Sequence, residues 1–304
     1  MKLIKWLCLA CALCLCLSVH VGFAQAKPKV ITTTTMLYDL VRVIAGDTVE
    51  LEGLMGVGLD PHIYQASAGD VRKLQQADII AMHGMHLEGR LGKVLENLER
   101  MNKTIISLEN GIDSSQLLHD AENPNVVDPH IWFDVTLWMQ AAQYVTQELS
   151  KVMPEHSALY AKNAEKYLQE LTALDQMVRE QIQSIPQKSR VLITAHDAFS
   201  YFGRAYGIEV KGVQGISTDA ESSTSAISSL ANFIVESKVK AIFIETSTGD
   251  KSIRALQEAV KSQGFETQIG GALLSDSLGN EEDSLFSYIA MVKYNTETIV
   301  NALQ

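Results

Sequence analysis

Cysteine is missing from nearly all of this chain. The four cysteines, Cys8, Cys11, Cys14 and Cys16, lie close to the start of the 304 residues, and none follows them. The remaining sequence offers no thiolate, which excludes a disulfide-stapled scaffold and any metal site with sulfur ligands. A metal bound by this part of the chain must be held by nitrogen and oxygen atoms.

Long apolar runs are equally scarce beyond the first residues. Lys2 and Lys5 precede or flank an almost wholly apolar stretch over residues 6–18, and Ala24-Gln25-Ala26 puts small residues where a signal peptidase cleaves. This pattern predicts a cleavable secretory signal over residues 1–26 and a periplasmic mature protein. No later stretch of the sequence is apolar enough to span a bilayer.

A lipid anchor is the alternative use of these cysteines. Cys11 follows Leu9-Ala10, but Cys8 stands where a lipidation signal usually carries leucine, and Cys14 and Cys16 each follow a leucine directly. Because the fit is poor, we favour cleavage over attachment through a lipid or through an uncleaved signal.

Positive charge is in the minority. The chain has 25 Lys and Arg against 36 Asp and Glu, a net charge of −11, and the signal would take two lysines with it. An acidic exported protein is a poor binder of polyanions, so we expect no nucleic-acid partner.

Glycine and proline are both absent from residues 155–185, where apolar residues recur at helical spacing. This pattern predicts one long helix over residues 154–186, roughly 45 Å in length, which exceeds the width of a small domain. We interpret it as a strut between an N-terminal lobe (27–153) and a C-terminal lobe (187–304).

On either side of this helix, apolar strand-like runs alternate with helical patterns. Such alternation is typical of parallel sheets with right-handed crossovers. The fold class predicted is α/β: two lobes, each with a roughly four-stranded parallel sheet flanked by helices, joined by one long rigid helix. The expected strands are 30–34, 49–54, 79–82, 104–107, 191–194, 208–213, 241–244 and 267–269, and the expected helices 37–45, 67–76, 91–100, 198–206, 222–238, 252–263 and 285–303.

Two near-identical tripeptides, Asp60-Pro61-His62 and Asp128-Pro129-His130, carry the chemistry. His196 and Asp276 continue the series at comparable intervals. Imidazole and carboxylate bind first-row metals, and open parallel sheets bind ligands beyond the carboxyl ends of their strands. A lone histidine is usually a core or surface residue; the repeated context favours ligation by His62 and His130. Spacing alone does not distinguish Asp276 from other carboxylates.

The motifs together resemble the cluster A-I solute-binding family of bacterial manganese and zinc uptake ABC transporters. The resemblance covers the whole mature chain and rests on Gly58-Leu59-Asp60-Pro61-His62-Ile63-Tyr64, Asp128-Pro129-His130-Ile131-Trp132-Phe133-Asp134, Thr194-Ala195-His196-Asp197-Ala198-Phe199 and Gly270-Gly271-Ala272-Leu273-Leu274-Ser275-Asp276-Ser277. It implies one metal between two lobes, bound by His62, His130, His196 and Asp276.

The resemblance also bears on the metal. Zinc-specialised members often carry a His-rich loop before the second motif, whereas His119 stands alone in residues 119–125 here. This favours Mn²⁺, or Mn²⁺ and Zn²⁺ together, with Fe²⁺ a further candidate, as transported ligand at one site per chain.

Other residues have weaker claims. Glu245 and Asp197 are candidates for orienting a ligand from outside the site, but a plain strand-end carboxylate explains each equally well. His83 and His86, around Gly84, suggest either a second metal site or, as we favour, packing near the first.

These features indicate an extracytoplasmic metal-binding protein, not an enzyme, that delivers its metal to a membrane ABC permease, with a monomer as the default state. The competing functions are a secreted metallohydrolase and an adhesin with a structural metal. Catalytic zinc typically keeps an open position, and the sequence has no H-E-x-x-H motif.

Overall fold

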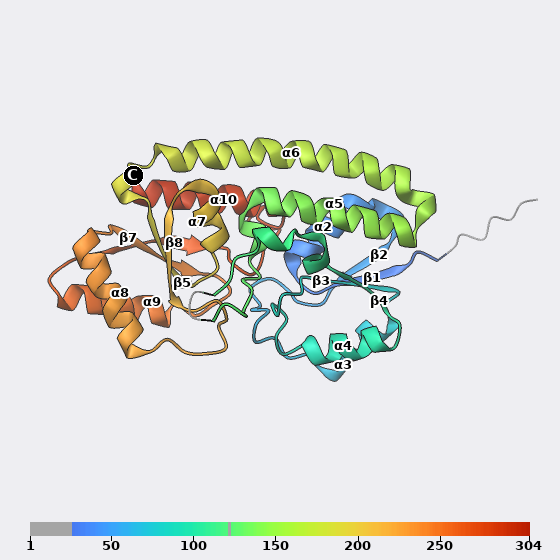
Figure 1. Ribbon diagram of the computed structural model, residues 1–304, viewed down its shortest axis with the longest axis horizontal. Coiled ribbons are helices and arrows are strands. Elements are labelled where there is room, and N and C mark those ends of the chain that lie inside the picture. Colours follow the sequence, from blue (N-terminus) through green and yellow to red (C-terminus); the bar gives the residue numbers. More distant parts are fainter. Residues whose placement is uncertain (1–25, 121–122) are drawn as a thin grey trace, which may run out of the picture.

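Two α/β halves lie beneath one long helix in the computed structural model, which describes residues 26–120 and 123–304 (Figure 1). The four cysteines and the predicted signal, except Ala26, lie outside these residues. Ala121 and Glu122, in the 119–125 loop that bears on metal preference, also lie outside them. Among the described residues, no helix combines the length and the apolar character that a membrane span requires.

The first half contains a four-stranded, fully parallel sheet in the order β2-β1-β3-β4. Thr34 caps the first helix, and Ser67 and Asp70 form a reciprocal capping box at the start of the second. The elements are β1 (Lys29–Thr32), α2 (Thr35–Ala45), β2 (Glu50–Gly53), α3 (Ala68–Gln76), β3 (Ile79–Met82), α4 (Gly92–Arg100) and β4 (Thr104–Ser107).

The second half repeats this plan with one difference. Its four parallel strands form two ladders, β5 with β6 and β7 with β8, and β5 lies beside β7. A register shift at Ile242/Phe243 interrupts the second ladder. The elements are β5 (Val191–His196), α7 (Ser200–Tyr206), β6 (Glu209–Gln214), α8 (Thr224–Ser237), β7 (Ala241–Glu245), α9 (Lys251–Ser262), β8 (Gln268–Leu273) and α10 (Tyr288–Leu303).

The helix that links the halves is α6 (Ser157–Ser184), which a short 3₁₀ turn, Pro154–His156, precedes. Its 28 residues give a rod of about 42 Å, and it runs across α5, α2, α7 and α10 (Figure 1). The expectations above omit α5 (Val135–Val152), which Asp134 caps by accepting the N–H of Thr136. This helix packs antiparallel along α6 and adds to the layer of helices that α6 contacts.

One hydrophobic core runs through both halves below α6. Trp138 and Leu171 of the first half and the long helix belong to the same buried cluster as Phe243 and Tyr288 of the second half. Two smaller cores fill the outer faces of the sheets, under α3 and α4 and under α8 and α9. Because the halves share their main core, a change in their relative position must disturb close-packed side chains.

The shared core makes a prediction about Leu171, which is fully buried on α6. Leu171→Ala should lower the free energy of unfolding by about 2–5 kcal/mol, because it removes buried methyl groups and leaves a cavity. Urea unfolding measures the change. Leu159→Ala on the same helix is the matched control, since Leu159 is 41% exposed and should cost far less. Equal losses would contradict a core continuous beneath this helix.

Candidate metal centre

Four loops bring the predicted residues together. His62 lies between β2 and α3, His130 between β4 and α5, and Asp276 between β8 and α10, whereas His196 is the last residue of β5 itself. Each is therefore at the carboxyl edge of a strand or in the loop that follows it, two from each half. All four are buried, and one ligand atom from each lies within 4.8 Å of the others.

The repeated Asp-Pro-His motif is a backbone device. Oδ1 of Asp60 accepts the N–H of His62 at 2.9 Å, and Oδ1 of Asp128 accepts the N–H of His130 at 3.0 Å. Aspartate two residues ahead thus folds each turn around its proline. The Asp-Pro pair ahead of each histidine therefore fixes the backbone that carries the imidazole.

Asp128 has a second task, because its Oδ1 also lies 2.7 Å from Nδ1 of His130. Glu245 at the end of β7 does the same for His196: Oε2 is 2.6 Å from Nδ1 and Oε1 accepts the backbone N–H at 2.9 Å. A carboxylate partner fixes the proton on Nδ1 and leaves the Nε2 lone pair free to bind a metal.

The other tentative residue, Asp197, is arranged differently. Its Oδ1 accepts the hydroxyl of Ser200 at 2.7 Å, and the described part of the chain shows no hydrogen bond from it to a histidine of the centre. Burial raises the pKa of Asp197. Of the two carboxylates named from the sequence, Glu245 contacts a histidine directly and Asp197 caps the turn into α7.

The Nε2 atoms face one another. Nε2 of His130 is 3.2 Å from that of His62 and 3.3 Å from that of His196. Asp276 closes the group, with Oδ2 at 3.3 Å from Nε2 of His196 and Oδ1 at 3.6 Å from Nε2 of His130. Ligands of a tetrahedral zinc ion with bonds of about 2.0–2.1 Å are about 3.3–3.4 Å apart, so the donor atoms already have the spacing of one coordination shell.

The charges of the group require a cation. Neither oxygen of Asp276 accepts a hydrogen bond of normal geometry from a described residue, although both are buried. A buried carboxylate without a partner is strongly unfavourable, and lone pairs of neutral imidazoles that face each other repel. A proton or a divalent metal between these atoms removes both penalties.

The pKa shifts follow from burial and from this crowding. Burial lowers the pKa of His62 to about 3. Burial also opposes a charged His196, but the carboxylates of Glu245 and Asp276 outweigh it and raise its pKa well above the usual value. For Asp276, burial acts to raise the pKa, yet His196 and its neighbours lower it well below the usual range. The proton therefore belongs on His196, where a metal would compete for it.

Two aromatic residues hold the loop that carries His130 in place. The indole of Trp132 packs edge-on against the ring of His130, with centroids 5.2 Å apart, and its Nε1 donates to the carbonyl of Ser275 at 3.0 Å. Tyr201 donates to the carbonyl of Asp128 at 2.8 Å. Trp132 thereby ties the loop of His130 to the loop of Asp276 across the two halves. Sequence reasoning quoted Trp132 within a motif but gave it no role.

His83 and His86 do not form a second site. His83 is buried, lies 2.9 Å through Nε2 from the hydroxyl of Thr34 and packs against Trp132, whereas His86 is exposed. Among the described residues, the centre at His62 is the one group with three ligating atoms close enough for a metal. The preference for packing over a second metal agrees with this geometry.

Fold and site together define a class: a bilobal α/β protein with a buried cluster of three imidazoles and one carboxylate between its halves. The family described as zinc-uptake complex component A, periplasmic, matches residues 30–302, and the chain belongs to this family. The expectation from the motifs is thus confirmed.

Individual relatives agree. The zinc-binding protein TroA of Treponema pallidum (strain Nichols) is 44% identical over 96% of this chain and 97% of its own length. The manganese-binding lipoprotein MntA of Bacillus subtilis (strain 168) is 40% identical over 92% and 91%. The solved structure of periplasmic zinc-binding TroA superimposes with a TM-score of 0.88 at 45% identity, covering 91% of this chain and 99% of that one. In the sequence, residues 210–218 and 241–245 themselves predict a likeness to this treponemal protein, and the overall identity confirms it.

The buried His83 predicts a pH dependence of stability. Burial lowers its pKa to about 3, so below about pH 6.5 the unfolded chain takes up a proton that the folded protein refuses. The free energy of unfolding should therefore fall as the pH drops through this window, by about 2 kcal/mol for this group between pH 6.5 and 5.

Urea unfolding of chelator-treated protein at pH 7.5 and pH 5 tests this, with His83→Asn as the comparison. The variant should lose about 2 kcal/mol less on acidification, while the similar contribution of His62 cancels because both proteins contain it. Identical losses would show that His83 accepts its proton in the folded state.

Proposed function

We propose that this protein is an extracytoplasmic receptor that captures one divalent transition metal and passes it to a membrane ABC permease. His62, His130, His196 and Asp276 are the ligands. The observation that carries the proposal is the orphaned carboxylate of Asp276 facing three Nε2 atoms at ligand spacing. Glu245 and Asp128 orient His196 and His130 from outside the coordination shell.

Manganese and zinc are the metals that the donor set supports, with ferrous iron a weaker candidate. Three neutral nitrogens and one carboxylate suit any of them, and a carboxylate with both oxygens free allows a fifth bond for manganese. The names of relatives point the same way: TroA is called zinc-binding and MntA manganese-binding. Zinc binds such sites more strongly than manganese, so supply and the permease must contribute to selection.

We further propose the arrangement 1–26 signal peptide, 27–153 first lobe, 154–186 linking helix and 187–304 second lobe, with the mature protein in the periplasm and monomeric. Support comes from the long helix α6 and from relatives named as periplasmic or as lipoproteins of metal ABC transporters. The partner is then the permease of such a transporter. We propose that the protein binds this permease as a monomer and binds no nucleic acid.

A metallohydrolase fits the site less well. A hydrolytic zinc needs an open position for water, but four protein atoms already surround the metal position and all four residues are buried. An adhesin with a structural metal would show no metal exchange, so exchange separates it from a receptor.

Metal content of the purified mature protein, by elemental analysis, is the first test. We expect about one manganese or zinc per chain, and loss of most of it in Asp276→Ala and in His196→Ala, because each removes a ligand. Asp283→Ala and His156→Ala are matched controls, since Asp283 is exposed and His156 lies at the start of α6, far along the chain from the centre. Full metal content in both ligand variants would refute the site.

Glu245→Gln tests the orientation of His196. The amide keeps the size but cannot hold the proton on Nδ1 as strongly, so metal affinity should fall by about 10–100-fold without loss of the fold. Competition with a fluorescent chelator measures the affinity, and circular dichroism checks folding. Glu236→Gln, at an exposed position on α8, should bind as the unaltered protein does. An unchanged affinity for Glu245→Gln would make Glu245 a plain strand-end residue.

A further inference from the structure

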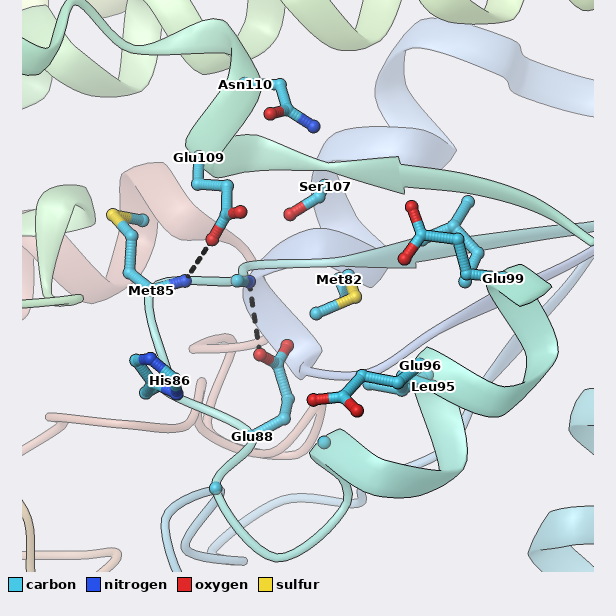
Figure 2. A pocket seen from close by; sticks show the side chains of 14 residues that line it. Met82, Met85, His86, Glu88, Leu95, Glu96, Glu99, Ser107, Glu109 and Asn110 are labelled. Atoms are coloured by element: carbon cyan, nitrogen blue, oxygen red, sulfur yellow. Dashed lines mark hydrogen bonds between the residues drawn. The ribbon is translucent and has the colours of Figure 1, made fainter.

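A second polar pocket lies in the first half, at the carboxyl ends of β3 and β4 and beside α4. It encloses about 270 Å³, and the proposed metal receptor makes no use of it. The side chains of four glutamates surround it and the hydroxyl of Ser107 points into it (Figure 2). The glutamates are Glu88, Glu96, Glu99 and Glu109, and none of the described residues that line the pocket is Lys or Arg.

The floor of the pocket is a buried carboxylate whose outer oxygen has capacity left. Glu88 is only 2% exposed. Its Oε1 accepts the hydroxyl of Thr33 at 2.7 Å and the N–H of His83 at 2.8 Å, whereas Oε2 accepts one long bond, 3.2 Å, from the N–H of Gly84. Burial raises the pKa of Glu88, so a cation beside Oε2 would stabilise its charge.

Ser107 supplies an independent sign of a ligand. Its side chain is 9% exposed, and its hydroxyl oxygen is buried with no hydrogen-bond partner among the described residues. Buried hydroxyls are normally paired, so an unpaired one that faces a cavity indicates a missing partner. The acidic rim sets the sign of that partner's charge. Glu109, whose Oε2 accepts the N–H of Met85 at 2.6 Å, and Glu99 on α4 favour a cation. Glu96 adds to them, although Arg100 already lies 3.6 Å from its carboxylate.

The pocket is too open for a bare metal ion. Among the described residues, only the His62 centre brings three ligating atoms within 4.8 Å of one another, so these carboxylates cannot form one inner coordination shell. Met82, Leu95 and Ile105 line the walls between the carboxylates. Apolar walls around a polar floor suit a cation that ends an aliphatic stem, as lysine side chains do when they bury their methylenes.

We propose that this pocket binds an alkylammonium group, whose three N–H donors are shared among Ser107 Oγ, Glu88 and Glu109 while its methylenes lie against the apolar walls. Such a group comes either from a free aliphatic amine or from a lysine side chain of a partner protein. An ammonium matches the pocket in charge and in number of donors.

Calorimetric titration of the mature full-length protein with pentylamine, and with 1-pentanol as the neutral probe of similar shape, tests the proposal. Pentylamine should bind, more weakly at high salt because the rim charges are exposed, and 1-pentanol should not. Equal binding of the two, or binding of Mg²⁺ without binding of pentylamine, would overturn it.

Variants locate the site. Ser107→Ala should weaken pentylamine binding by about ten-fold, as loss of one hydrogen bond to a charged group does, and the double change Glu96→Gln with Glu99→Gln should weaken it and flatten its salt dependence. Glu165→Gln, exposed on α6, is the matched control. These surface or small changes avoid the folding risk of replacing Glu88. Unaltered binding in both test variants would place the amine elsewhere.

Two further titrations identify the source of the ammonium. Tighter binding of 1,5-diaminopentane than of N-acetyl-lysine methylamide would support a free amine, and the reverse would support a protein side chain. Asp276→Ala should bind pentylamine normally, because the pocket and the metal centre share no residue. The two proposals therefore stand or fall separately: a failure of metal binding at the centre would not affect amine binding in the pocket, and a failure of amine binding would not affect metal binding.

Discussion

The structure depends on one mechanical constraint: two side chains of the proposed metal centre come from each half and must be held within a few ångströms of one another. The core beneath α6 meets it, because it is one close-packed body that belongs to both halves. Trp132 connects this core to the centre. Its indole packs against His130 and donates to the carbonyl of Ser275, and its own backbone carbonyl accepts the hydroxyl of Tyr288. A small relative movement of the two halves would therefore change the distances between the four side chains of the centre.

The electrostatics of the proposed centre favour a positive charge between its four side chains. The buried carboxylate of Asp276 demands a positive charge, and either a metal or a proton on His196 provides it. Carboxylate partners hold the Nδ1 protons of His130 and His196 and leave the Nε2 atom of each ring free to bind a metal. Proton and metal thus compete for the same lone pair, which keeps the metal-free protein from holding an unpaired buried charge.

The sequence predicted much of this because the relevant signals are local. Each strand or helix of the alternation, the uninterrupted helix before Pro186 and each Asp-Pro-His tripeptide is recognised from consecutive residues. What it could not predict is long-range: Glu245 meets His196 across 49 residues, and Asp276 is distinguished from other acidic residues by family resemblance alone. The division of the second sheet into two ladders depends on a register shift at Ile242/Phe243 that leaves no mark in the apolar pattern. Helix α5, which the expected elements omit, begins directly after the His130 motif, and Asp134 of that motif caps it.

The metal centre between the halves and the β3–β4 pocket of the first half are kept distinct by their donor atoms. Imidazole nitrogens at ligand spacing displace the water around a transition metal, whereas separated glutamates at the β3–β4 pocket leave a divalent ion largely hydrated. An alkylammonium group has the opposite preference. It donates hydrogen bonds to separated carboxylates and a hydroxyl, and it does not form the coordination bonds that imidazole nitrogens offer a transition metal. Acidic residues beside a metal receptor's site would otherwise compete for its cargo. Their spacing limits that competition, because the carboxylates do not close around one metal ion, while the negative field that attracts cations remains.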